Sequence, residues 1–236
     1  SSATKKVTPG GVYDLDIDLI PNSYATRWKP QWQNIMYIRP RSPQTDFDTW
    51  GQDTGRNCPK EAKKLAVISK TDFDLYVDAL SPEGGTYHDA GMIWGGRLSS
   101  PDGIFASTVN APAPNNGYVS RHLIFMTDGE PGQQPHLTSL YGVEWHDQKV
   151  VGSGLTTRDS IMAAEVARHG ERLRAVCESV KGKGIRIWVI VFESSLTSDL
   201  KSCASDNSSF ISDNAASLNT AFVKIANSIS ELRIVQ

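Results

Sequence analysis

The chain has 236 residues, of which 39% are apolar, and a formal net charge of −2 at pH 7. This length supports one α/β core with surface insertions better than two independent domains, so we expect a single domain over residues 1–236. The nearly neutral charge, without a basic stripe, argues against nucleic-acid binding and against a polybasic membrane patch. The longest mainly apolar stretch, residues 185–192 with one arginine, is too short to cross a bilayer.

Residues 1–57 form an irregular region that is rich in Pro, Trp, Asn and Asp and has no helical period. Residues 12–19 alternate between apolar and polar side chains, which predicts a half-exposed strand. Such a strand would place Asp14, Asp16 and Asp18 on one face. A row of three carboxylates is typical of either a calcium site or a solvated polar face.

An α/β pattern begins at residue 58 and continues to the end of the chain. The run KKLAVIS, residues 63–69, predicts a strand, and Thr71 is a candidate N-cap for the helix after it. The apolar residues of that helix recur at helical spacing. They are Phe73, Val77 and Leu80.

A second helix is predicted to start at Thr86, directly after Gly84 and Gly85. One stripe of it holds Ala90, Ile93, Trp94 and Arg97. The following segment, residues 99–119, is rich in Pro, Asn, Ser and Gly, which predicts a loop.

Residues 123–127 read LIFMT and are followed directly by Asp128 and Gly129. Because this run is apolar on both faces, it predicts a buried strand of a parallel sheet. Ligands of such sheets gather beyond the carboxyl ends of the strands, which makes Asp128 a candidate ligand-binding residue. The pair Asp-Gly is also common in ordinary turns, so the motif alone leaves both interpretations open.

Two helices and one more strand complete the predicted core, after a surface insertion at about residues 131–157. Residues 158–180 form a helix that ends in the glycine-containing sequence KGKG, and residues 185–192 form a second buried strand. The stripe of the first helix is Met162, Val166, Leu173, Val176, Cys177 and Val180. The stripe of the terminal helix is Leu218, Phe222, Ile225, Ile229 and Leu232. This order predicts a three-layer, Rossmann-like α/β fold whose mainly parallel sheet is flanked by helices.

The Thr86 hydroxyl and the Asp128 carboxylate are hard oxygen ligands of the kind that Mg²⁺ and Mn²⁺ prefer. With GGT at 84–86 and MTDG at 126–129, the sequence resembles the von Willebrand factor A fold. The adhesion site of that family joins a DxSxS loop, a threonine and the aspartate of a TDG turn. The resemblance implies that Thr86 and Asp128 belong to a divalent-cation site.

Longer stretches look like the C-terminal portion of TadG-type proteins of Tad pilus assembly in Gram-negative bacteria. They are GGTYHDAGMIWGGRLSSPDGIF, HLIFMTDGE and CESVKGKGIRIWVIVF, within residues 55–236. The resemblance implies a non-enzymatic role in pilus assembly or adhesion, with other pilus-assembly or surface proteins as partners. It also implies a periplasmic or extracellular domain and a membrane anchor in a longer parent protein.

The sequence departs from this family in one respect, because it contains no DxSxS motif. We therefore expect an incomplete site at Thr86 and Asp128, with weak binding of Mg²⁺ or Mn²⁺ or none. The missing loop follows the first strand, which is central in that fold. The chain is then either a fragment that begins after that strand or a degenerate member. Three arrangements of the sheet are then possible. Residues 12–20 take the place of the missing strand, or the sheet stays incomplete, or a strand of another chain pairs with it.

Cys58, Cys177 and Cys203 are widely spaced and form no CxxC motif, which argues against a structural zinc site. Three cysteines are compatible with one disulfide and one free thiol, or with three thiols. In an oxidising periplasm, which the resemblance implies, we expect Cys177 and Cys203 to be bonded.

The alternative function is a metal-dependent hydrolase that uses Asp128, His88 and Asp89. His88 and Asp89 are adjacent on the predicted helix, and adjacent side chains point about 100 degrees apart. The two side chains therefore need not converge on one substrate.

Overall fold

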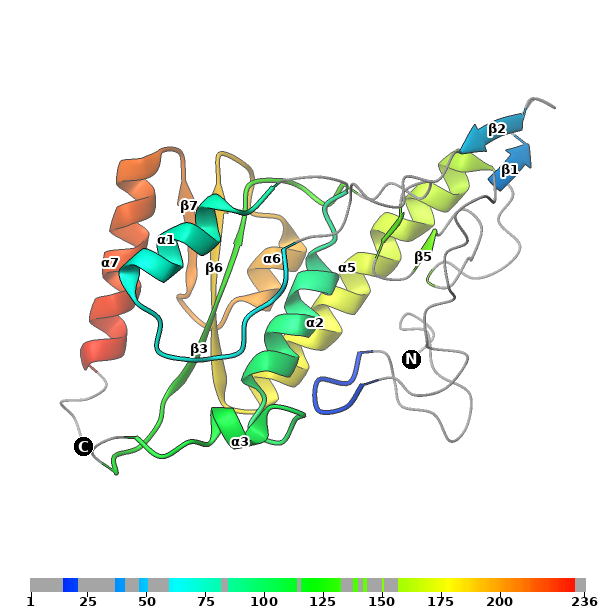
Figure 1. Cartoon of the computed structure of the whole chain (residues 1–236). Helices are drawn as coiled ribbons and strands as arrows, with labels where there is room; N and C mark the ends of the chain where they lie inside the picture. Colours follow the sequence, from blue (N-terminus) through cyan, green and yellow to red (C-terminus); the bar gives the residue numbers. More distant parts are fainter. Residues whose placement is uncertain are drawn as a thin grey trace.

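The structure is a computed structural model that describes residues 15–20, 37–40, 47–50, 60–81, 85–113, 116–132, 138–139, 142–143, 150 and 157–231 (Figure 1). The first elements in chain order are β1 (Tyr37–Pro40), β2 (Phe47–Trp50), α1 (Lys70–Asp78), α2 (His88–Ser99), α3 (Ala106–Val109) and β3 (Arg121–Thr127). They are followed by β4 (Thr138–Ser139), β5 (Gly142–Val143), α5 (Arg158–Gly182), β6 (Ile185–Phe192), α6 (Ser198–Cys203), β7 (Ser209–Ser212) and α7 (Ala215–Glu231).

Within the described residues, the main sheet has three parallel strands in the order β3-β6-β7, with β6 in the centre. Strand β3 pairs with β6 over its whole length, from Arg121 opposite Ile185 to Thr127 opposite Val191. The pairs β1-β2 and β4-β5 are separate antiparallel hairpins. The predicted α/β class and the parallel sheet are therefore confirmed.

Helices cover the sheet on two sides, which gives three layers (Figure 1). Successive side chains of β6 point to opposite faces, as in any strand. On one face Ile187, Val189 and Val191 pack with residues of α2 and α5. On the other face Trp188 and Ile190 pack with α7. Because both faces are covered, β6 is largely buried, and all its residues except Arg186 are apolar.

The predicted helix over 158–180 is α5, which ends two residues later than expected. Gly184 follows it with a φ of 72°, a left-handed conformation that glycine adopts without strain. The predicted strand 185–192 is confirmed as β6, and the predicted strand 123–127 is β3 with two more residues at its start. The predicted loop 99–119 contains one short helix, α3.

The prediction for residues 60–81 was wrong in several respects. Residues 63–69 do not form a strand, and the N-cap of α1 is Ser69, whose side chain accepts a hydrogen bond from Asp72 N, rather than Thr71. The predicted stripe of Phe73, Val77 and Leu80 is exposed, and α1 has no buried residue. Helix α1 is therefore stabilised by its N-cap and by contacts between its own residues, such as the pair Lys70–Asp74, rather than by packing on the core.

Residues 15–20 form turns and bends rather than part of the strand predicted over 12–19. Asp16 Oδ1 accepts hydrogen bonds from the backbone N–H groups of Asp18 and Leu19, at 2.8 and 3.1 Å. Asp18 instead pairs with Lys183, at 2.6 Å. Because the two carboxylates have separate partners, they do not form the row of calcium ligands that a strand would have produced. Asp14 lies outside the described residues.

We call residues 15–20 the clip, because contacts with α2 and with Lys183 hold this segment against the core. Ile17 is buried in the main cluster, and a Cβ atom on Gly96 would lie only 2.8 Å from Ile17 Cγ2. Arg97 Nε donates to the carbonyl of Asp16, at 3.3 Å, and Ser100 Oγ donates to the Asp18 carboxylate. A glycine at position 96 is thus needed for the close approach of the clip to α2.

Replacing Ile17 with alanine is expected to lower the free energy of unfolding by about 2 to 3 kcal/mol, because it leaves a cavity beside Gly96 and Val180. Urea denaturation followed by circular dichroism measures this loss. The matched control is Leu19→Ala in the same segment, where the side chain is 50% exposed. Equal effects of the two substitutions would show that the clip does not contribute to the core.

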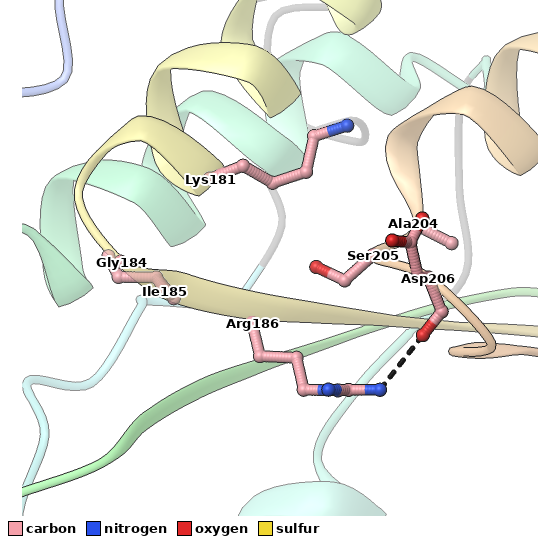
Figure 2. Close-up of a pocket in the computed structure, with 7 residues that line it drawn as sticks. All are labelled: Lys181, Gly184, Ile185, Arg186, Ala204, Ser205 and Asp206. Atoms are coloured by element: carbon pink, nitrogen blue, oxygen red, sulfur yellow. Dashed lines mark hydrogen bonds between the residues drawn. The ribbon is translucent and has the colours of Figure 1, made fainter.

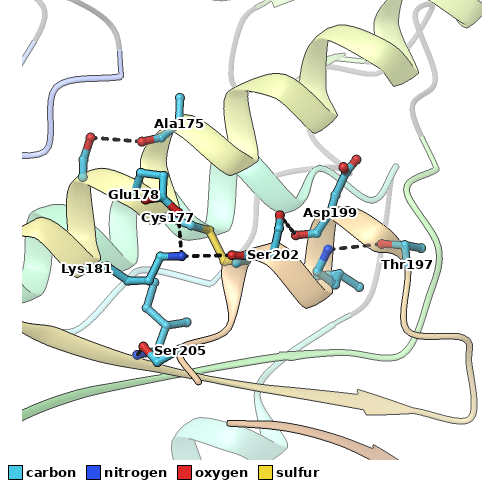
Figure 3. Close-up of a disulfide and its surroundings, with 12 residues drawn as sticks. Ala175, Cys177, Glu178, Lys181, Thr197, Asp199, Ser202 and Ser205 are labelled. Carbon is cyan, nitrogen blue, oxygen red and sulfur yellow. Dashed lines mark hydrogen bonds and ion pairs between the residues drawn. A yellow bond between two sulfur atoms is a disulfide. The ribbon is translucent and has the colours of Figure 1, made fainter. Parts of the chain in front are cut away.

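Cys177 in α5 and Cys203 at the end of α6 form a disulfide, with their Cα atoms 5.1 Å apart (Figure 3). Both cysteines are fully buried. Next to the bond, Lys181 donates to the carbonyl of Ser202, at 3.0 Å, and forms an ion pair with Glu178. These contacts fix α6 against α5, while Cys58 lies outside the described residues.

Candidate functional site

Thr86 lies beside the loop that follows β3. Its backbone N–H donates to the carbonyl of Gly132, at 3.0 Å, and the N–H of Gly132 donates to the carbonyl of Thr86, at 3.1 Å. A Cβ atom on Gly129 would lie 4.0 Å from Thr86 Oγ1. The structure therefore brings Thr86 to the turn that carries the exposed carboxylate of Asp128. Thr86 precedes α2 by two residues instead of starting it.

The turn itself is organised by Thr127. Its hydroxyl donates to the carbonyl of Gly129, at 3.2 Å, and accepts from the N–H of Gly129, at 3.3 Å. His88 Nε2 lies 3.1 Å from the same hydroxyl, and the imidazole stands edge-on to Phe125. Burial lowers the pKa of His88, which favours the neutral imidazole. His88 thus supports the Asp128 turn from the inside of the fold.

Asp89 belongs to a set of polar residues between α2 and α5, all of them buried except the half-buried Tyr87, which we call the buried polar cluster. Its members are Tyr87, Asp89, Glu165, His169 and Arg172. His169 Nδ1 lies 2.8 Å from each oxygen of Asp89, and Arg172 Nε lies 3.1 Å from one of them. The hydroxyl of Tyr87 donates to Glu165, at 3.0 Å.

Burial alone would raise the pKa of Asp89, but the hydrogen bond and charge of His169 and the charge of Arg172 outweigh it. The pKa of Asp89 is therefore held below its ordinary value, and the carboxylate is ionised inside the protein. An ionised carboxylate in this environment requires its cationic partners.

The three residues of the predicted hydrolase do not converge. His88 faces Thr127 of β3, whereas Asp89 faces His169 and Arg172 of α5. Asp128 is exposed at the end of β3, and Asp89 is completely buried. Within the described residues, no three His, Cys, Asp or Glu side chains are grouped so that they could hold a metal ion.

The sequence did not reveal the buried polar cluster, because the apolar stripe of α5 was assigned to Met162 and Val166. Val166 is 47% exposed, and the buried positions of this half of the helix include Glu165 and His169 instead. The spacing of four residues between Glu165 and His169, one turn apart on the same face, was the available signal.

A second contact joins the loops at the carboxyl end of the sheet. Ser195 Oγ, in the loop after β6, donates to Glu130 Oε1, at 2.7 Å. Glu193, in the same loop, has a φ of 50°. The turns after β3 and β6 are thus tied together at the edge that carries Asp128.

A pocket of about 380 Å³ lies at the other end of β6, where the strand begins (Figure 2). It is lined by Lys181, Gly184, Ile185, Arg186, Ala204, Ser205 and Asp206. Its cations already have protein partners, because Lys181 pairs with Glu178 and Arg186 donates to Ser208 and to the carbonyl of Asp206. None of the predicted site residues lines this pocket.

Comparisons of the chain with protein-family models, with curated proteins and with solved structures returned no match. Among the described helices, none combines the length and the apolar character needed to span a lipid bilayer.

Proposed function

We propose that the chain is a non-enzymatic protein-binding domain of the von Willebrand A type, acting in Tad-type pilus assembly or adhesion at the bacterial envelope. The pairing of Thr86 with Gly132 supports this proposal, since it brings a hydroxyl next to the turn with the exposed Asp128 carboxylate. In parallel α/β sheets, ligands bind at this edge.

Binding at this edge would use oxygen ligands. The Thr86 hydroxyl and the Asp128 carboxylate suit a Mg²⁺ or Mn²⁺ ion, and a carboxylate of the partner protein would complete its coordination. The two protein ligands would hold such an ion only weakly, so the partner contributes much of the affinity.

The disulfide between Cys177 and Cys203 supports a periplasmic or extracellular location for the domain. Buried disulfides persist in oxidising compartments and are rare where thiols are kept reduced. In this proposal, the partners are other pilus-assembly or surface proteins.

A pull-down of purified pilus components with the immobilised domain tests the function. Capture should fall when Mg²⁺ is replaced by EDTA, and Asp128→Asn should reduce it to the EDTA level. The control is Asp206→Asn, an exposed aspartate at the opposite end of the sheet, which should not change capture. Capture that is insensitive both to EDTA and to Asp128→Asn would refute a role of this edge.

Magnesium titration in calorimetry measures the intrinsic cation affinity. We expect a dissociation constant in the millimolar range or no detectable heat, because charged oxygen ligands determine affinity for hard cations and this site offers a single carboxylate. Any heat that is seen should disappear in Asp128→Asn. Micromolar binding to the wild-type domain would contradict this prediction.

The hydrolase alternative requires Asp89, which is buried and engaged by His169 and Arg172. A screen for phosphatase and esterase activity with added Mg²⁺ or Mn²⁺ should therefore find no turnover. Metal-dependent turnover that is lost in Asp128→Ala would instead favour the enzyme.

A further inference from the structure

Strand β3 forms one edge of the parallel sheet in the part of the chain that the structure describes. It pairs with β6 on one side, and the described residues provide no strand on its other side. At seven residues, β3 is nearly twice as long as β7, the four-residue strand at the other edge. A long edge strand presents a row of backbone N–H and C=O groups to which another strand can bind.

The side chains of β3 are apolar and only partly covered. Leu123 and Phe125 pack against the cluster under α2, but Ile124 and Met126 on the opposite face are 42% and 54% exposed. The neighbouring residues of β6 on that face, Trp188 and Ile190, are buried against α7. An additional strand at this edge would therefore gain both backbone hydrogen bonds and apolar contacts.

We propose that β3 pairs with β3 of a second copy of this chain, in antiparallel orientation, to give a continuous sheet of six strands across a two-fold axis. The strand is self-complementary in this orientation. Its basic end, with Arg121, meets the acidic end of the partner strand, where Asp128 and Glu130 follow Thr127. A parallel arrangement would place like charges together at each end.

The two-fold axis passes near the middle of the strand, at Ile124. This register places Ile124 against its symmetry mate and Met126 against His122 of the other copy, so that the exposed apolar face continues across the interface. Such an interface is isologous, because both copies contribute the same surface.

Sedimentation equilibrium over a range of concentrations tests the proposal. The wild-type chain should show a reversible dimer, and Ile124→Lys should weaken it by about tenfold or more, because two ammonium groups would face each other. The control is Ile211→Lys on β7, where the side chain is 55% exposed, and its dimer should be unchanged. Circular dichroism verifies that each variant is folded.

A cross-link tests the register without disturbing charge. Directly opposed residues of antiparallel strands have Cα atoms about 4.5 to 5.5 Å apart, within the range of a disulfide. Mild oxidation of Ile124→Cys should give a covalent dimer linked through the substituted positions, as shown by mass spectrometry of the peptides. Ile211→Cys should give no such link.

Three results would overturn the proposal. They are a wild-type chain that stays monomeric at all concentrations, a dimer that survives Ile124→Lys, and equal cross-linking at positions 124 and 211. If β3 pairs with a strand of another protein instead, the purified chain stays monomeric, and the proposal of a dimer is wrong.

Discussion

Replacing Asp89 with alanine is expected to lower the free energy of unfolding by about 3 to 5 kcal/mol, the largest single effect that we predict. The substitution removes the carboxylate that faces His169 and Arg172, and Arg172 has no side-chain exposure. A buried guanidinium that loses an ionised partner is destabilised, because its charge is then less well compensated inside the protein. Guanidinium chloride denaturation measures the loss.

The matched control for this substitution is Asp128→Ala, which removes an exposed carboxylate from a nearby part of the fold. Its effect on stability should be within about 0.5 kcal/mol. If the two alanine substitutions cost the same, the buried polar cluster would not contribute to stability as proposed.

Asp89 also makes stability depend on pH. Its pKa is lower in the folded than in the unfolded state, so the unfolded chain binds more protons in the acidic range. The stabilisation is complete above about pH 4, the ordinary range of aspartate, and decreases as the pH falls toward the folded-state pKa. Stability of the wild-type chain should therefore fall more steeply below pH 4 than that of Asp89→Asn. Parallel pH profiles of the two proteins would contradict this.

Removing the disulfide with the pair Cys177→Ala and Cys203→Ala is expected to cost about 3.5 kcal/mol. The estimate follows from the sequence separation of 26 residues, since the bond restricts the unfolded chain over that length. Thermal unfolding followed by circular dichroism measures the change.

Reduction of the wild-type chain provides the internal control. Dithiothreitol should lower the melting temperature of the wild-type protein to near that of the double variant, and it should leave the double variant unchanged. A wild-type melting curve that does not respond to reductant under denaturing conditions would show that the bond does not contribute to stability.

The elements with continuous apolar runs were predictable from the sequence. Strand β6 was predicted with the observed bounds, because a strand that is covered on both faces is apolar at nearly every position, here at all but Arg186. Helix α5 was predicted within two residues, since its C-terminal half has a clear apolar period and a glycine follows its end. The motif at Asp128 also suggested its place at the end of β3.

Other parts could not be predicted, for identifiable physical reasons. The run over 63–69 has the composition of a strand, but a strand also needs a neighbour for its backbone, and the sequence does not specify one. Phe222 was assigned to the buried face of α7, but it is 39% exposed, whereas Ala221 next to it is buried. A helical stripe fixes the buried face only to within about one residue, so it cannot decide between adjacent positions.

The candidate site was predictable in part. The pattern selected Thr86 and Asp128, and the structure places Thr86 beside the turn that carries Asp128. The roles of His88 and Asp89 could not be decided from the sequence, because each depends on a residue far along the chain. His88 contacts Thr127, and Asp89 contacts His169.

The clip also determines how the domain would carry mechanical load. A pull on the chain before residue 15 enters the core through Ile17 and through the ion pair of Asp18 with Lys183. Lys183 directly follows α5, the helix that is covalently joined to α6. Tension from the N-terminal side would thus pass into α2 through Gly96 and Arg97, and into the pair of helices that the disulfide cross-links.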